Sequence, residues 1–299
     1  MLFCEDFHIG QNDGTSIALG NFDGVHKGHA EVICHAVNST TLTSVVLTYK
    51  HHPLWVLTGR TVQLLTPPSI KGKEIEKLGI EVFINIDFEL VRNLSPEEFL
   101  LLLKEQLNCK KISCGYNFRF GKDRTGNTET LIKLCEKHNI EVNITQSILE
   151  DGDAVSSTRI RKELMDGNIT MANQLLGRNF GFDFTVITGD QRGRLMGTPT
   201  INQRLPEDFI KPKFGVYASL VTIEEKVYQA ITNIGLRPTF GEAKAGAETF
   251  IIDYSGNLYG QNIYVELTDY IRDERKFTSA EELKRQIAAD VEQRKVICQ

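Results

Sequence analysis

The arrangement of hydrophobic segments changes near residue 180, and this change limits the fold more than any other feature of the 299-residue sequence. Before that point, short apolar or β-branched runs alternate with helical patterns. Such alternation is typical of βαβ units, whose right-handed crossovers build a mostly parallel, doubly wound, Rossmann-like sheet. The expected strands of this part are Ser16–Leu19, Ser44–Thr48, Val82–Ile86, Ile112–Cys114 and Val142–Ile148.

From about Phe184 onward, apolar strands follow one another through short turns, without intervening helices. Strands followed by a single terminal helix predict an antiparallel β-barrel or sandwich. The expected strands of this part are Phe184–Ile187, Val216–Ile223, Val227–Ile231, Phe250–Tyr254 and Ile263–Leu267.

Local signals mark helix ends in both parts. Ser-Pro-Glu-Glu at 95–98 is a capping box with proline at the first helical position, and it predicts a helix to about Leu107. Gly79 and Gly167 follow helical patterns and predict glycine C-caps. A second box, Thr-Ser-Ala-Glu at 278–281, predicts the terminal helix. The apolar stripe expected on that helix consists of Leu283, Ile287 and Val291.

Length and composition set the outer limits. Hydrophobic residues make up 41% and charged residues 24%, which is ordinary for a globular protein, and the length suits two domains, 1–180 and 181–299. A net charge of −5 without blocks of like charge argues against nucleic-acid or membrane binding through charge alone. The six cysteines lack Cys-x-x-Cys or zinc spacing, which indicates reduced thiols. No signal peptide and no apolar run of about 20 residues is present, so we expect a cytoplasmic protein.

The first candidate site is the segment GNFDGVHKGH at 20–29, which follows the first expected strand of the alternating part and leads into a helix. Its glycines permit a tight turn and a close approach of a ligand to backbone N–H groups. A helix start also offers unpaired N–H donors and a positive dipole end, so an anion is the expected ligand. His26 and His29 can point two donors at one phosphate. Glycines are common connectors and histidines common caps, but two histidines in this setting favour binding.

Two further segments lie at positions where ligands bind. Thr48–Pro53 follows the second strand, at the carboxyl edge where open α/β sheets bind ligands. Val155–Arg161 places hydroxyls and an arginine at a helix start, which serves equally as an N-cap or as a phosphate contact. All seven histidines precede residue 139, so a base in the second part must be a carboxylate.

Together these segments resemble the nucleotidylyltransferase superfamily, and specifically the prokaryotic bifunctional riboflavin kinase/FAD synthetase family. The resemblance covers nearly the whole chain. Its motifs are GNFDGVHKGH at 20–29, Thr-aromatic-x-x-His-Pro at 48–53, GYNFRFGKDRTG at 115–126 and SSTRIR at 156–161. The first and last are shared by many adenylyl- and cytidylyltransferases, whereas the block at 115–126 is more specific to the flavin branch.

In the first part, the resemblance implies adenylylation of FMN by ATP. His26 and His29 would stabilise the charge that develops on the α-phosphate and on the leaving pyrophosphate. His52 and Asn117 would contact the flavin. The residues of this part implied in nucleotide binding are Gly20, Phe22, Asp23, Gly24, Ser157, Thr158 and Arg161, and Gly197 of the second part is implied in nucleotide binding as well.

In the second part, the resemblance implies a riboflavin kinase. The family carries Gly-Phe-Pro-Thr-Ala-Asn where this chain has Gly-Thr-Pro-Thr-Ile-Asn at 197–202, and it implies that Thr200 and Asn202 hold Mg²⁺ and nucleotide phosphate. Glu248 matches the catalytic base. Three positions depart from the family pattern, namely Thr198, Ile201 and Phe250.

The implied function is ATP-dependent phosphorylation of riboflavin to FMN, followed by adenylylation of FMN to FAD with release of pyrophosphate. Riboflavin, FMN, FAD and ATP would be its partners and Mg²⁺ its cofactor. Because of the three departures, a monofunctional FAD synthetase with a degenerate kinase part stays an alternative. A nucleotidylyltransferase of other specificity and a non-catalytic flavin- or RNA-binding protein are the other two.

Overall fold

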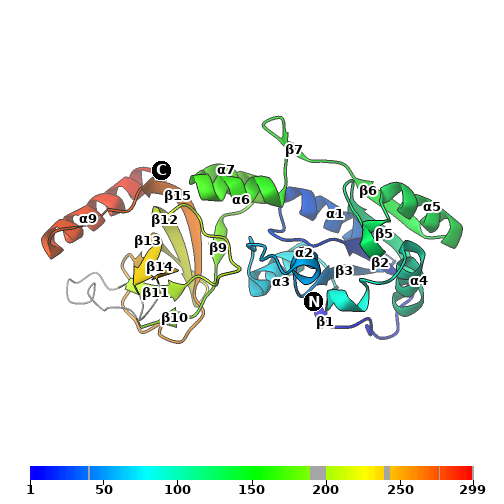
Figure 1. Cartoon of the computed structure of the whole chain (residues 1–299). Helices are drawn as coiled ribbons and strands as arrows, with labels where there is room; N and C mark the ends of the chain where they lie inside the picture. Colours follow the sequence, from blue (N-terminus) through cyan, green and yellow to red (C-terminus); the bar gives the residue numbers. More distant parts are fainter. Residues whose placement is uncertain (40, 189–199, 239–242, 276, 298–299) are drawn as a thin grey trace. The chain divides into compact units, whose positions relative to one another are not determined.

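The computed structural model describes residues 1–39, 41–188, 200–238, 243–275 and 277–297 (Figure 1). Residues 1–62 and 68–156 form one unit, and residues 63–67 and 157–299 form another. Each unit contains one large sheet, and the first also has a small hairpin. We refer to them as the first and the second unit.

The first unit is built on a six-stranded sheet in the order β1-β4-β3-β2-β5-β6, in which every neighbouring pair is parallel (Figure 1). The chain moves from β2 to β3 on one side and later returns to β5 on the other. The ends of β2 and β5 therefore form a topological switch point, where open α/β sheets bind ligands. The strands are β1 (Leu2–Cys4), β2 (Thr15–Leu19), β3 (Thr43–Tyr49), β4 (Val82–Ile86), β5 (Cys109–Gly115) and β6 (Glu141–Thr145), with the hairpin β7 (Leu149–Glu150) and β8 (Asp153–Ala154). The helices are α1 (Lys27–Val37), α2 (Pro53–Thr58), α3 (Pro68–Lys77), α4 (Pro96–Leu107) and α5 (Thr128–His138), with short 3₁₀ turns at Phe88–Leu90 and Lys122–Arg124.

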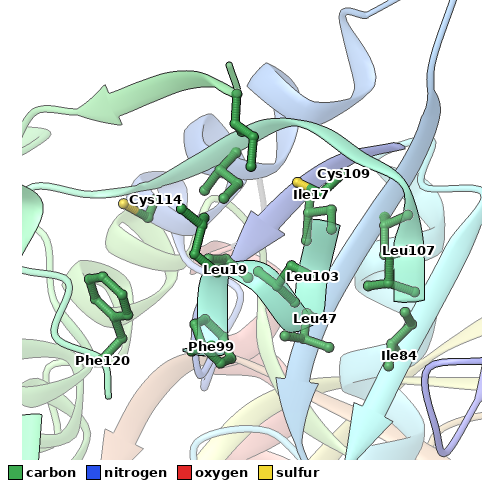
Figure 2. Packing of buried hydrophobic residues seen from close by; sticks show 14 of the residues in the cluster. Ile17, Leu19, Leu47, Ile84, Phe99, Leu103, Leu107, Cys109, Cys114 and Phe120 are labelled. Atoms are coloured by element: carbon green, nitrogen blue, oxygen red, sulfur yellow. The ribbon is translucent and has the colours of Figure 1, made fainter. Parts of the chain in front are cut away.

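Two apolar layers cover the two faces of this sheet, because side chains alternate along each strand. On one face, Leu19 and Leu47 pack with Phe99 and Leu103 from α4 (Figure 2). On the other, Ala18 packs with side chains from α1 and α3. The sheet is thus doubly wound, as the sequence predicts.

The sequence signals of this unit are confirmed in detail. All five expected strands are present, with ends that differ by at most a few residues. The Ser95 hydroxyl accepts a hydrogen bond from the Glu98 N–H (3.3 Å), and the Glu98 carboxylate accepts one from the Ser95 N–H (2.7 Å). Gly79 adopts φ of 90°, as a glycine C-cap requires.

The second unit contains a seven-stranded antiparallel sheet in the order β10-β11-β14-β13-β12-β15-β9 (Figure 1). The two edge strands, β9 and β10, are consecutive parts of the stretch 180–187. The sheet is therefore strongly curled, with its two edges joined by this stretch. The antiparallel half-barrel with a terminal helix agrees with the expected fold class. The strands are β9 (Phe180–Phe182), β10 (Val186–Ile187), β11 (Thr200–Arg204), β12 (Gly215–Ile223), β13 (Lys226–Pro238), β14 (Ala243–Ile251) and β15 (Tyr264–Arg272), and the helices are α6 (Ser157–Asp166), α7 (Ile169–Leu176) and α9 (Ala280–Ile297).

Of the strands expected in this unit, only Val216–Ile223 matches closely. Strand β13 runs to Pro238 rather than to residue 231, β14 spans Ala243–Ile251 rather than 250–254, and β15 runs to Arg272 rather than to residue 267. The expected strand 184–187 overlaps β10 only at 186 and 187, and β9 and β11 were not expected. For β13 and β14, the cause is polar residues on the buried face. Thr232 and Thr249 are fully buried, and their hydroxyls share a hydrogen bond of 2.9 Å. Such satisfied hydroxyls remove the apolar alternation on which a strand prediction rests.

The terminal helix α9 begins one residue later than its sequence box predicts. The Ser279 hydroxyl accepts a hydrogen bond from the Glu282 N–H (3.2 Å), and the Glu282 carboxylate accepts two from Thr278 (3.0 Å each). The capping pair is therefore Ser279 and Glu282, not the residues at 278 and 281.

The buried face of α9 is partly charged, contrary to the expected apolar stripe. Asp290 and Arg294 are each only 1% exposed, whereas the stripe residues are half-buried. The Arg294 guanidinium donates to the Ser219 carbonyl at 3.3 and 3.4 Å. These hydrogen bonds offset part of the cost of burying the Arg294 charge, so the helix packs through polar as well as apolar contacts.

Within the described ranges, no helix is both long enough and apolar enough to cross a membrane.

Candidate active sites

The loop between β2 and α1 has a strained backbone. Phe22 has φ of 50° and Val25 has φ of 42°, in the left-handed region that bulky and β-branched residues rarely adopt. Such strain costs about 1–3 kcal/mol per residue and is concentrated at functional sites. The Phe22 ring is 1% exposed, and it lies over Gly20, where an added Cβ would be 2.9 Å from the ring. The loop is therefore held in one conformation by packing.

The two histidines of this loop stack on one another at the start of α1. Their ring centroids are 3.6 Å apart with planes inclined by 14°, and the Phe22 ring meets His29 edge-on at 5.4 Å. His26 is the N-cap, and its Nδ1 accepts a hydrogen bond from the His29 N–H (3.2 Å). A neutral His26 ring consequently carries its proton on Nε2, which is then a donor. The Nδ1 atom of His26 thus serves as the helix cap, and Nε2 is the donor atom of the neutral ring.

A lysine that the sequence analysis did not select lies beside this loop. The Lys71 ammonium donates to the Thr48 hydroxyl (3.1 Å), and the Thr48 hydroxyl donates to the Asn21 carbonyl (3.1 Å). Burial lowers the pKa of Lys71 to about 8, and the charge of Asp23 opposes that shift. Lysines on amphipathic helices usually face solvent, so no signal in the sequence distinguishes Lys71.

The two residues expected to contact the flavin, His52 and Asn117, follow β3 and β5, the strands on either side of β2. His52 caps α2, and its Nδ1 accepts a hydrogen bond from the Leu54 N–H (3.1 Å). Asn117 is exposed in the segment after β5. Because β3, β2 and β5 are adjacent and parallel, the segments after them meet at one edge of the sheet. The histidine loop, His52 and Asn117 therefore belong to the same edge of the first unit.

The expected phosphate contacts at the start of α6 belong to the second unit. Ser157 is the first residue of that helix, and Thr158 follows it. The Arg161 Nε donates to the Gln63 carbonyl (2.7 Å), within the same unit. The helix start thus has hydroxyls and an arginine fixed by backbone contacts.

In the second unit, three polar side chains form a row across neighbouring strands. Glu248 on β14 lies opposite Asn202 on β11 and opposite Asn233 on β13. Directly opposed residues point to the same face with Cβ atoms about 4.5–5.5 Å apart. The half-buried Glu248 carboxylate is therefore flanked by two amides, of which the sequence analysis selected only Asn202. The stretch 233–240 resembles the kinase part of the family in sequence, but only strand register shows that Asn233 lies beside Glu248.

Strand register places two of the three departures from the family pattern, Ile201 and Phe250, on opposite faces of the sheet. Thr200 lies opposite Phe250, and alternation places both on the face of Glu248. Ile201 lies opposite the buried Thr249, on the other face of the sheet. The change at 201 therefore leaves the polar row intact, whereas the change at 250 borders it. Gly197 and Thr198 lie outside the described residues.

The described residues contain no group of three or more His, Cys, Asp or Glu side chains that could hold a metal ion. Magnesium does not need such a cage, because it keeps waters and uses substrate phosphates with one or two protein oxygens. The hydroxyl of Thr200 and the amide of Asn202 are oxygen donors of that kind, so the donor set fits Mg²⁺ bound together with a nucleotide.

Comparison with known proteins likewise divides the chain into two parts. A sequence model described as FAD synthetase matches residues 8–159, and one described as riboflavin kinase matches residues 176–298. The chain belongs to the bifunctional riboflavin kinase/FAD synthetase family. The parallel first unit and the antiparallel second unit are the two folds expected of that family.

Curated relatives match over nearly the whole chain. The bifunctional riboflavin kinase/FMN adenylyltransferase of Bacillus subtilis is 36% identical over 92% of this chain and 89% of its own length. The protein of the same name from Escherichia coli K12 is 33% identical over 93% and 91%. A crystal structure from Streptococcus pneumoniae, described as a macrolide-efflux protein, has a TM-score of 0.87 at 30% identity and covers 98% of both chains. This family member thus shares its complete architecture with a solved structure.

Proposed function

We propose that this enzyme makes FAD from riboflavin in two ATP-dependent steps, each at its own site. The observation that carries the proposal is that the histidine loop lies on the parallel sheet of the first unit, whereas the polar row lies on the antiparallel sheet of the second unit. The matches to both family models support the assignment of one step to each. Riboflavin, FMN, FAD and ATP are the ligands that the two steps require.

In the kinase step, the 5′-hydroxyl oxygen of riboflavin attacks the γ-phosphorus of ATP while the bond to the β,γ-bridging oxygen breaks. The hydroxyl proton passes to Glu248, and FMN and ADP leave. Thr200 and Asn202 hold the nucleotide phosphates together with Mg²⁺, which supplies charge neutralisation. Phosphoryl transfer depends mainly on such positioning and charge stabilisation, so a single carboxylate base is sufficient.

In the adenylylation step, a phosphate oxygen of FMN attacks the α-phosphorus of ATP, and the bond to the α,β-bridging oxygen breaks. The nucleophile is already ionised, so no strong base is needed. His26 and His29 donate to the charge that develops on the α-phosphate and on the leaving pyrophosphate. His52 and Asn117 orient the flavin.

The remaining nucleotide contacts come from two segments. The backbone of the loop at 20–24 faces the phosphates. Ser157, Thr158 and Arg161 bind the outgoing phosphates, and Gly197 contributes to the kinase nucleotide site. We assign adenylylation to residues 1–180 and phosphorylation to 181–299, which is supported by the ends of the two family matches at 159 and 176. We further assign the enzyme to the cytoplasm, where both substrates are at hand and the free thiols of the five described cysteines are stable.

A time course separates this proposal from its alternatives. The protein is incubated with riboflavin, ATP and Mg²⁺, and the flavins are resolved chromatographically. The proposal expects FMN first and FAD later. FAD formation from supplied FMN without any FMN formation from riboflavin would identify a monofunctional FAD synthetase. A preference for an acceptor other than FMN would indicate a different nucleotidylyltransferase, and no turnover at all would indicate a binding protein.

A further inference from the structure

The Lys71 ammonium connects helix α3 to the loop that precedes the stacked histidines. Its hydrogen bond reaches the hydroxyl of Thr48, which is fully buried, and the Thr48 hydroxyl reaches the backbone carbonyl of Asn21. The contacts therefore run from α3 through the end of β3 to the loop. Phe22, the next residue after Asn21, has one of the two strained backbone conformations.

A buried carboxylate lies in the same loop. Asp23 is 4% exposed, and its charge favours the protonated form of Lys71, although the effect of burial on the pKa of Lys71 is larger. A buried carboxylate close to a binding site for polyphosphate is unfavourable, because like charges repel most strongly where water is excluded. A neighbouring ammonium compensates that charge.

The strained loop also needs restraint. Residues in sparsely populated backbone conformations keep them only when surrounding contacts over-determine the geometry. The bond from Thr48 to the Asn21 carbonyl is one such contact, and Lys71 holds the Thr48 hydroxyl. With a pKa of about 8, Lys71 is mostly charged at neutral pH.

We propose that Lys71 is a positioning residue for the adenylylation step. It fixes the segment 21–23 through Thr48, and it neutralises Asp23 so that the phosphates of ATP can approach the start of α1. This inference rests on the proposed function of the first unit and adds a residue that no motif indicates.

The test is a double-mutant cycle on FAD formation from FMN and ATP. The variants are Lys71→Met, Asp23→Asn and the pair together, with Lys77→Met as the matched control, since Lys77 lies on the same helix but is exposed. The KM for ATP and the KM for FMN are measured separately. Lys71→Met is expected to raise the KM for ATP at least tenfold and the KM for FMN less than twofold, because the flavin contacts are carried by other segments.

Coupling between the two charges is the decisive quantity. The rise in the KM for ATP in the double variant is expected to be at least about fivefold smaller than the product of the rises in the two single variants. The reason is that the double variant contains no uncompensated carboxylate. Independent, multiplicative effects would refute the neutralisation of Asp23, and an unchanged KM for ATP in Lys71→Met would refute the inference altogether. Equal rises of both KM values would reveal a merely structural role and also refute it.

The outcome is distinguishable from a failure of the proposed function. His29→Ala removes a residue of the histidine loop itself, so unaffected FAD formation in that variant would overturn the site assignment. Loss of activity in His29→Ala with normal kinetics in Lys71→Met would overturn only the role of Lys71. The double variant replaces both charges by neutral groups of similar size, so it provides a folded comparison if Lys71→Met alone is unstable.

Discussion

Removal of the Asp290 charge is expected to destabilise the second unit severely. Asp290 on α9 is 1% exposed, and its two carboxylate oxygens accept hydrogen bonds from Arg272 Nε (2.9 Å) and Nη2 (2.8 Å). Gln286 donates a third bond at 2.8 Å. The substitution Asp290→Asn keeps the shape of the side chain but leaves the Arg272 guanidinium without its counter-charge.

The expected magnitude follows from these contacts. Breaking a buried ion pair by removing one partner costs about 3–5 kcal/mol. Arg272 is partly exposed and Asn retains one acceptor oxygen, so we expect the lower end, about 3 kcal/mol. With a denaturant dependence of about 2 kcal/mol per molar urea, the unfolding midpoint of the second unit falls by roughly 1.5 M.

The single tryptophan makes the assay specific. Trp55 lies in the first unit, so its fluorescence follows that unit, whereas far-ultraviolet circular dichroism follows both. In Asp290→Asn, the dichroism change that reports the second unit should move to lower urea concentration, while the midpoint of the Trp55 fluorescence change stays the same. The control is Asp166→Asn, which breaks an exposed pair with Lys162 and is expected to cost at most about 0.5 kcal/mol. If Asp290→Asn costs no more than this control, the argument from burial and pairing is wrong.

Three further predictions concern the first unit. Gly28→Ala should reduce FAD formation, measured as an initial rate, because the new Cβ would lie 3.3 Å from the His26 ring. The melting temperature should not fall, because alanine favours the helix by up to about 1 kcal/mol relative to glycine. Ser95→Ala removes the acceptor for the Glu98 N–H and should lower the urea-derived free energy of unfolding by about 1 kcal/mol. For Lys71, burial lowers the pKa from 10.5 to about 8, so between pH 8 and 10 the unfolded chain keeps a proton that the folded chain has released. Its contribution to the free energy of unfolding therefore rises with pH by up to about 1.4 kcal/mol per unit. Buried thiols such as Cys109 and Cys114, whose pKa values burial raises, lower the stability of parent and variant alike over this range. Urea titrations at pH 7.5 and 9.5 should therefore show the free energy of unfolding of the parent rising relative to that of Lys71→Met.

Much of the first unit could be predicted from the sequence because its signals are local. The strand Val82–Ile86 is apolar except for Asn85, and its predicted ends are the observed ones. The capping box at Ser95 joins groups three residues apart, so it is readable without a tertiary structure. The motif at 20–29 likewise lies within one loop, which explains why the expected histidines prove to be neighbours.

What the sequence does not show are contacts between distant elements. Asn233 on β13 lies beside Glu248 on β14 because of the strand register. Lys71 on α3 is linked to the loop residue Asn21 through the hydroxyl of Thr48 on β3. The buried Asp290 was missed because a charged residue at helical spacing is ordinarily solvent-exposed. In each case a polar group lies next to residues that are distant in the chain, and hydrophobic patterning carries no record of those neighbours.

The most direct test of two independent active sites is a comparison of the two single reactions in two variants. FMN formation from riboflavin and FAD formation from supplied FMN are measured as initial rates in Glu248→Gln and in His29→Ala. Loss of a general base typically lowers a rate by about 10²–10⁴-fold. We expect Glu248→Gln to lose FMN formation to that extent and keep FAD formation, and His29→Ala to do the reverse. Loss of both reactions in either variant would contradict the assignment.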